Sequence, residues 1–239
     1  ATAAALSDLA AAAARPLGLL LALTIPERWR GDVADLTDGI GEAARAALCP
    51  IVGGDLSRGT ELSLTVTVLG GTSAPLRRDG ARPGDTVWVT GRLGGPHAAL
   101  RAWLEGRAPR GAHRDRFARP VPRLGEARWL AARGATAAVD LSDGLVADLR
   151  HVAAASGVVI ELDAERVPRI EGVTLDDALG GGEEYELIVT MGPDASFRPS
   201  EFEDAFDVPI TRIGHVVSRG APSVVARVDL PGGHDHFSR

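Results

Sequence analysis

The sequence predicts an α/β or α+β fold, because strand-like and helix-like patterns alternate along its 239 residues. Apolar residues recur at helical spacing between Arg28 and Leu48. From Glu61 to Leu69 apolar and polar residues alternate, as in a strand with one buried face. Hydrophobic residues make up 45% of the chain, which allows a sizeable core, and aromatic residues only 4%, so we expect a core of Ala, Val, Leu and Ile.

The other elements follow from local patterns and from Pro and Gly at their ends. Further helices are expected at residues 1–14, near 97–105, at 122–133 and from Leu145 onward, and further strands at 17–25, 50–52, 86–90, 137–141, 158–162, 185–190, 211–217 and 223–229. The Arg- and Pro-rich stretch 106–122 is expected to be a loop. Because residues 70–83 are rich in Gly, Pro, Ser and Arg, we predict two domains, 1–72 and 73–239.

Composition excludes several classes of protein. The formal net charge of −6 disfavours a nucleic-acid binder, which needs a basic surface. Cys49 is the only cysteine, so no disulfide or Cys-based zinc site can form within one chain, and a reducing, cytoplasmic setting is expected. The longest apolar run, Leu17 to Ile25, is too short to span a bilayer, so no membrane partner is expected.

The chain contains no lysine, and all 26 of its basic Lys/Arg positions are arginine. A Walker-type phosphate loop, protein-kinase chemistry and Schiff-base chemistry each require a lysine. Any phosphate chemistry must therefore use arginine, backbone N–H groups and metal ions.

A first candidate motif is the run Gly53-Gly54-Asp55-Leu56-Ser57-Arg58-Gly59. Its paired glycines allow close approach of a ligand, Asp55 offers the oxygen ligand that Mg²⁺ prefers, and Arg58 could contact phosphate. A turn between strands with a solvated Asp explains the same residues, and both interpretations remain open.

A second motif, Asp140-Leu141-Ser142-Asp143-Gly144, lies where a predicted strand feeds a helix that carries Asp148. Ser142 or Asp143 could simply cap that helix. A cap does not explain three carboxylates beside a helix N-terminus, which already favours anions, and the group suggests Mg²⁺ bridging phosphates.

A third motif, Gly180-Gly181-Gly182, precedes Glu183 and an alternating strand. The glycines suggest a flexible approach to a ligand that Glu183 faces, whereas a glycine-rich hairpin with a charged edge is the alternative. Asp8, in Leu6-Ser7-Asp8-Leu9-Ala10, would by itself be an ordinary Asp on a helix surface.

Together and in this order, the motifs resemble the thiamine-monophosphate kinases, of the superfamily that includes aminoimidazole ribonucleotide synthetase. The resemblance rests on Leu6-Ser7-Asp8-Leu9-Ala10, Gly53-Gly54-Asp55 with Arg58-Gly59, Arg82-Pro83-Gly84-Asp85 with Val89-Thr90-Gly91, Arg119-Pro120 with Pro122-Arg123, Asp140-Leu141-Ser142-Asp143-Gly144, Gly181-Gly182-Glu183 with Tyr185-Glu186-Leu187, and Asp235-His236-Phe237. These stretches span nearly the whole chain.

The resemblance implies a two-domain synthetase-like fold that dimerises by joining sheets across a two-fold axis. It implies direct in-line transfer of the ATP γ-phosphoryl to thiamine monophosphate, with Mg²⁺ held by aspartates. The roles implied are metal binding for Asp8, Asp55, Asp140 and Asp143, catalysis for Asp55 and Asp143, ATP contacts for Gly54, Asp55, Arg78 and Ser142, and substrate contacts for Glu183 and His234.

The sequence also departs from the family pattern. Ala5 replaces an Asn, Ala12-Ala13 a Met-Gly, Glu184 an Asp, and His234 an aromatic residue that stacks on the substrate. The resemblance leads us to expect a further segment before Ala1, with a Gly-Asp-Asp motif, and weak or absent catalysis without it. The alternatives are another ATP-dependent synthetase of the superfamily and a paralogue that binds nucleotide or thiamine phosphate without turnover.

Overall fold

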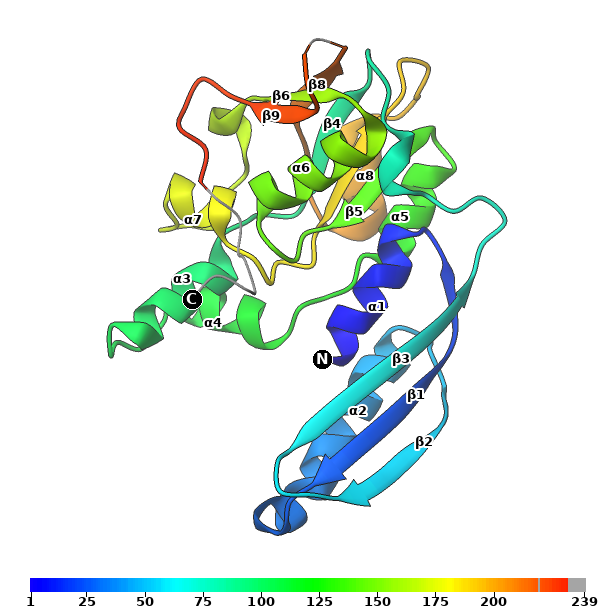
Figure 1. The fold of residues 1–239 in the computed structure, drawn as a ribbon, viewed down its shortest axis with the longest axis vertical. Helices are drawn as coiled ribbons and strands as arrows, with labels where there is room; N and C mark the ends of the chain where they lie inside the picture. Colours follow the sequence, from blue (N-terminus) through cyan, green and yellow to red (C-terminus); the bar gives the residue numbers. More distant parts are fainter. Residues whose placement is uncertain (219, 232–239) are drawn as a thin grey trace.

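The computed structural model describes residues 1–218 and 220–231, and it contains a three-stranded and a six-stranded sheet, each covered by helices (Figure 1). The N-terminal part comprises α1 (Thr2–Ala11), β1 (Arg15–Ile25), η1 (Glu27–Asp32), α2 (Val33–Ala46), β2 (Ile51–Arg58) and β3 (Ser63–Gly71). The C-terminal part comprises η2 (Arg78–Gly80), β4 (Thr86–Thr90), α3 (Gly95–Leu104), α4 (Gly111–Ala118), α5 (Leu124–Ala131), β5 (Ala135–Asp140), α6 (Leu145–Ser156), β6 (Val159–Leu162), η3 (Ala164–Arg166), α7 (Leu175–Gly180), β7 (Leu187–Met191), α8 (Pro199–Phe206), β8 (Ile210–Val217) and β9 (Ser223–Val225). The predicted mixed α/β class is confirmed.

The small sheet has the order β2-β1-β3, with β1 parallel to β2 and antiparallel to β3. Helix α2 covers one face, where Leu23 of β1 packs with Ile40. The alternation predicted for β3 is confirmed from Ser63 to Val68, where the apolar side chains are half-buried and the polar ones exposed, whereas Leu69 is exposed. Strand β1 is not buried along its whole length, because Leu17 and Leu20 are exposed.

The large sheet has the order β5-β7-β4-β8-β6-β9 and is antiparallel except for the β6–β9 pair. Two apolar cores lie on its two faces. Along β4, Val87 and Val89 belong to the core under α6, while Trp88 between them packs with the core under α5 and α8. Successive side chains of a strand point to opposite faces, so one strand serves both cores.

Helix α1 connects the two parts of the chain. Its Leu6 packs with Leu19 in the core of the small sheet, whereas Ala10 near its C-terminal end, and Ala13 just after the helix, join the core under α5 and α8. Figure 1 shows α1 lying between the small sheet and α5. This packing carries the first helix to the end of β5, where the candidate site forms.

Three helices, α4, α7 and α8, were not predicted from the sequence. Residues 106–122 were expected to form a loop, but they contain α4, whose sequence has no apolar stripe. Contacts to other elements stabilise α4 instead, such as the buried His113, whose Nε2 lies 3.0 Å from the carbonyl oxygen of Glu171. Helices α7 and α8 were not predicted, although Thr174 and Asp177 form a capping box at the start of α7.

None of the helices within residues 1–218 and 220–231 combines the length and the apolar character needed to cross a bilayer.

The core under α8 provides a stability prediction. Phe202 is fully buried and packs edge-on against Trp129, with ring centroids 5.6 Å apart. Phe202→Ala should lower the free energy of unfolding by about 3–5 kcal/mol, because it leaves a cavity among rigid rings. Urea unfolding followed by tryptophan fluorescence measures the change. Leu104→Ala, at a side chain that is 79% exposed, should shift it by less than about 0.5 kcal/mol; equal effects would contradict the assignment of the core.

Candidate active site

A buried carboxylate at the end of β5 is the centre of the candidate site. Asp140 is the last residue of β5, and α1 brings Asp8 close to it. Burial raises the pKa of Asp140, and the negative charge of Asp8 raises it further, while the Ser7 hydroxyl and the Arg78 guanidinium lower it. The structure therefore brings together three predicted site residues, namely Asp8, Asp140 and Arg78, which lie far apart in the sequence.

The loop that follows Asp140 is held by Asp148, from the first turn of α6. One carboxylate oxygen, Oδ2, accepts the N–H groups of Ser142 at 3.0 Å and Asp143 at 3.1 Å. The N-cap of α6 is Gly144, without any side-chain cap, so the interpretation of Ser142 or Asp143 as a simple cap is wrong. Burial raises the pKa of Asp148 to about 7, although the two N–H groups lower it.

Asp143 is partly exposed in the loop that follows β5. Its carboxylate, that of Asp148 and the imidazole of His151 place ligand atoms within 4.8 Å of one another. Nε2 of His151 lies 4.0 Å from Oδ2 of Asp143. Asp143 is thus the more exposed of the two carboxylates, whereas Asp148 is buried and accepts two loop N–H groups.

The glycine-rich loop after α7 runs directly beside the Asp140–Asp143 loop. The N–H of Glu183 donates to the carbonyl of Ser142 at 2.9 Å, and those of Glu184 and Tyr185 donate to the carbonyl of Leu141 at 3.1 and 2.8 Å. These bonds extend the pairing of β5 with β7 beyond both strands. They place Glu183 beside the aspartates.

The glycines of these loops let the two backbones touch. A Cβ on Gly182 would lie 2.2 Å from the carbonyl oxygen of Ser142, and one on Gly144 would lie 2.7 Å from that of Gly180. Gly144 also has a φ of 115°. Close packing between loops, which the sequence did not suggest, therefore accounts for Gly182 and Gly144.

Glu183 is held in an uncommon backbone conformation. Glu183 and Tyr185 have φ angles of 63° and 54°, left-handed values that cost non-glycine residues about 1–3 kcal/mol each. The Tyr185 hydroxyl donates to Oε2 of Glu183 at 3.0 Å. Burial raises the pKa of Tyr185, and the charges of Glu183, Asp140 and Asp8 add to the effect. The exposed Glu183 carboxylate thus shares one electrostatic environment with the aspartates.

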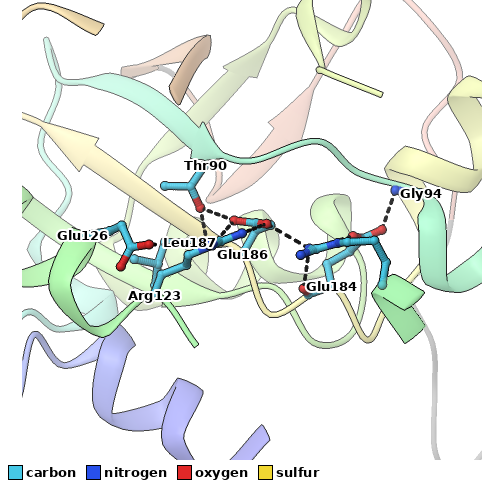
Figure 2. A network of polar contacts seen from close by, with 8 residues as sticks. Thr90, Gly94, Arg123, Glu126, Glu184, Glu186 and Leu187 are labelled. Carbon is cyan, nitrogen blue, oxygen red and sulfur yellow. Dashed lines mark hydrogen bonds and ion pairs between the residues drawn. The ribbon is translucent and has the colours of Figure 1, made fainter. Parts of the chain in front are cut away.

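Behind this loop lies a buried ion-pair network (Figure 2). Glu186 accepts hydrogen bonds from Arg123 at 2.7 and 2.6 Å, from Arg116 at 2.8 Å and from the Thr90 hydroxyl at 2.6 Å. Burial alone would raise the pKa of Glu186, but these donors hold it below its usual range. Glu186 is therefore a fully paired buried anion.

The neighbouring Glu184 is completely buried and differently paired. Its Oε1 accepts the N–H of Gly94, as drawn in Figure 2, and its Oε2 lies 3.7 Å from Arg116. Arg116 also donates to the backbone carbonyl of Glu184 at 3.0 Å. Burial raises the pKa of Glu184 to about 8, although Arg116 and the Gly94 N–H lower it.

The remaining predicted site residues lie elsewhere. Gly54 and Asp55 are exposed and lie within strand β2, so the turn considered in the sequence analysis is not present at these residues. Helix α1 packs against β3, and β1 lies between β3 and β2 in the sheet. The proposed roles of Gly54 and Asp55 stay predictions. His234 and the stretch 235–237 lie outside the described residues.

Several residues around the site were not anticipated as site residues. Arg123 belongs to the Pro122-Arg123 pair on which the resemblance drew, so its place in the chain was a signal. Arg116 lies in the stretch taken for a loop, among several arginines, and no sequence pattern distinguishes it. Ser7 and Tyr185 belong to stretches on which the resemblance drew, but only the structure shows their contacts.

Comparisons with known proteins agree with this geometry. The profile of the AIR synthase related protein, N-terminal domain, matches residues 1–72, and that of the C-terminal domain matches residues 82–227. The chain is similar to the thiamine-monophosphate kinase of Methanopyrus kandleri, at 44% identity over 68% of this chain and 56% of the relative. It is also similar to that of Salmonella typhimurium, at 37% identity over 87% of this chain and 66% of the relative.

Solved structures give the same result. The thiamine-monophosphate kinase of Stenotrophomonas maltophilia superimposes with a TM-score of 0.87 at 38% identity, over 96% of this chain and 77% of that one. The chain belongs to the thiamine-monophosphate kinase family. AaThiL, complexed with AMPPCP and TMP, has a TM-score of 0.84 at 32% identity, over 97% of this chain and 77% of that one. The chain spans 56% and 66% of the two sequence relatives given above.

Two glycines with positive φ, Gly91 next to the ion-pair network and Gly84 in open space, provide a matched pair of substitutions. Gly91 has a φ of 68°, and a Cβ there would lie 2.2 Å from Oε1 of Glu186, whereas Gly84 has a φ of 97° and open space around it. Gly84→Ala should cost about 1–2 kcal/mol of stability from backbone strain. Gly91→Ala should cost about 1–3 kcal/mol more, because the paired carboxylate must move. Chemical unfolding measures both; equal losses would show that the network can adjust freely.

Proposed function

We propose that this protein transfers the γ-phosphoryl group of ATP to thiamine monophosphate, giving thiamine diphosphate by direct in-line attack of the substrate phosphate. The observation that carries the proposal is the convergence of Asp8, Asp140, Asp143 and Glu183 from three separate segments of the chain. The printed names of the relatives support the reaction, and the AaThiL complex with AMPPCP and TMP supports the pair of ligands.

The donor set fits Mg²⁺. Asp140 is a buried carboxylate beside a second carboxylate, Asp8, and a divalent cation would offset both the lost hydration and the repulsion. We propose Asp8, Asp140 and Asp143 as ligands, and keep Asp55 as a candidate from the sequence. When bound, Mg²⁺ supplies charge neutralisation for the ATP phosphates.

The chain's own residues bind and orient the two substrates. Arg78, close to Asp140, is proposed to contact the nucleotide phosphates, and Ser142 to contact the nucleotide from the loop that Asp148 holds. Glu183 is exposed and anionic, so it can face the cationic thiazolium ring. With no lysine in the chain, phosphate recognition falls to arginine and backbone N–H groups.

The test is formation of thiamine diphosphate by the full gene product with Mg-ATP and thiamine monophosphate, measured by chromatography. Asp143→Asn should reduce product formation by at least about a hundredfold, because it removes a charged metal ligand. Asp204→Asn, at an exposed position on α8, is the matched control and should leave the rate unchanged. Folded wild-type protein that forms no product would refute the kinase proposal.

We further propose that the protein works as a homodimer in the cytoplasm, where its one thiol, the buried Cys49, stays reduced. Every residue of the outer strand β2 is exposed, and its apolar side chains Ile51, Val52 and Leu56 are 48–66% exposed. An exposed apolar edge strand favours pairing with another strand, and a second copy offers the same strand across a two-fold axis. Gly54 and Asp55 would then lie at the interface.

The dimer has its own test. Val52→Arg should convert the protein to a monomer in analytical ultracentrifugation, because an arginine on β2 opposes its own copy across the two-fold. Val225→Arg, at a valine that is 44% exposed on β9 of the large sheet, should leave the dimer intact. A wild-type monomer, or a Val52→Arg dimer, would contradict a β2-mediated interface.

A further inference from the structure

The backbone around Glu183 does not adopt its conformation by local preference. Two left-handed residues, Glu183 and Tyr185, flank Glu184, and neither is a glycine or an asparagine. Such a conformation persists only where the surrounding structure imposes it. The contacts that impose this backbone conformation also determine where the Glu183 carboxylate lies.

One set of contacts comes from the neighbouring loop. The N–H groups of residues 183–185 donate to the carbonyls of Leu141 and Ser142. These bonds fix the distance between the two loops. None of these three bonds involves the side chain of Glu183 or of Glu184.

The second set passes through Glu184, whose side chain is fully buried while that of Glu183 is exposed. The Glu184 carboxyl accepts the N–H of Gly94, in the turn before α3. With Glu184 anchored inside the protein, the adjacent Glu183 is left on the outside, where its carboxylate accepts the Tyr185 hydroxyl. The charges of Asp140 and Asp8 act on that same hydroxyl.

The third contact is made by Arg116 of α4. Its guanidinium donates both to the backbone carbonyl of Glu184 at 3.0 Å and to Oε1 of Glu186 at 2.8 Å, so it spans the loop where β7 begins. Its side chain is 20% exposed, and that of Glu184 is not exposed at all. Arg123 pairs with Glu186 but makes no hydrogen bond to Glu184 among the described residues. Arg116 is thus the arginine that joins the network to the loop.

We propose that Glu184 and Arg116 are positioning residues for the thiamine-phosphate side of the site, holding the 182–185 loop so that Glu183 faces the bound substrate. The inference rests on the proposed function for the identity of the substrate, but the loop conformation itself can be measured without any reaction. Neither residue touches the reacting atoms in this assignment. Each acts through the backbone of the loop.

The experiment compares Glu184→Ala, Glu184→Gln and Arg116→Lys with wild type. Glu184→Gln keeps an oxygen for the Gly94 N–H at similar size, so it should behave as wild type within about twofold. Glu184→Ala removes the anchor. Arg116→Lys keeps the positive charge, but a single ammonium group takes the place of the planar guanidinium and cannot make all of its hydrogen bonds. This variant provides the test if Glu184→Ala does not fold.

The first readout is amide hydrogen exchange, which requires neither activity nor ligand. In Glu184→Ala and Arg116→Lys, the amides of residues 183–185 should exchange at least about tenfold faster, while those of β4 and α8 stay as in wild type. Glu184→Gln should keep wild-type protection. Unchanged protection of residues 183–185 in the folded Glu184→Ala and Arg116→Lys proteins would overturn the proposal.

The second readout is the pair of KM values in the kinase assay. KM for thiamine monophosphate should rise at least about tenfold in Glu184→Ala and Arg116→Lys, because a misplaced contact loses its binding energy, while KM for ATP changes less than about twofold. Glu201→Ala, a glutamate of the exposed Arg198–Glu201 pair on α8, is the control for loss of a carboxylate.

The outcomes separate the two proposals. An inactive wild-type protein whose variants still show the exchange pattern refutes the kinase proposal and leaves the role of the network in the loop standing. An active wild type whose variants raise both KM values equally, with no selective loss of protection at 183–185, shows that Glu184 and Arg116 only stabilise the fold, and it refutes the positioning role.

Discussion

The site depends on the backbone pairing between the loop after α7 and the loop after β5. The N–H groups of residues 183–185 donate to the carbonyls of Leu141 and Ser142, and this continues the β5–β7 ladder past the ends of both strands. Strand pairing thereby sets the separation of Glu183 and Asp140. Because the two backbones touch, a side chain larger than hydrogen cannot be placed at Gly182 without displacing Ser142.

The distribution of arginines is the reason that we propose an external cation for one part of this region. Arg116 and Arg123 both pair with Glu186, which is therefore a stable buried anion. Asp140, also buried, has Arg78 as its nearby cation and Asp8 as a nearby anion, and its pKa is raised. The protein thus neutralises the carboxylate behind the loop with its own side chains, and it leaves those in front of the loop to the metal ion that we propose.

The two sides of the site also differ in how they are held. The Asp140–Asp143 loop is fixed by one helix residue, Asp148, whose carboxylate collects two N–H groups. The loop that carries Glu183 is held from three directions, by the neighbouring loop, by the turn at Gly94 and by Arg116 of α4. More contacts are needed there because two of its residues adopt left-handed conformations that the chain would otherwise avoid.

The sequence by itself determined the fold class, most strands and the order of the acidic motifs, because alternation and helical spacing are local signals. It could not reveal α4, since that helix has no apolar stripe and depends on contacts from Arg116 and His113. Nor could it show that Asp8 lies close to Asp140 while Asp55 lies on β2, at the edge of the small sheet, because spacing along a chain does not fix distance in space. The tertiary packing of α1 places Asp8 near Asp140, and the strand order of the small sheet places Asp55 on its outer strand.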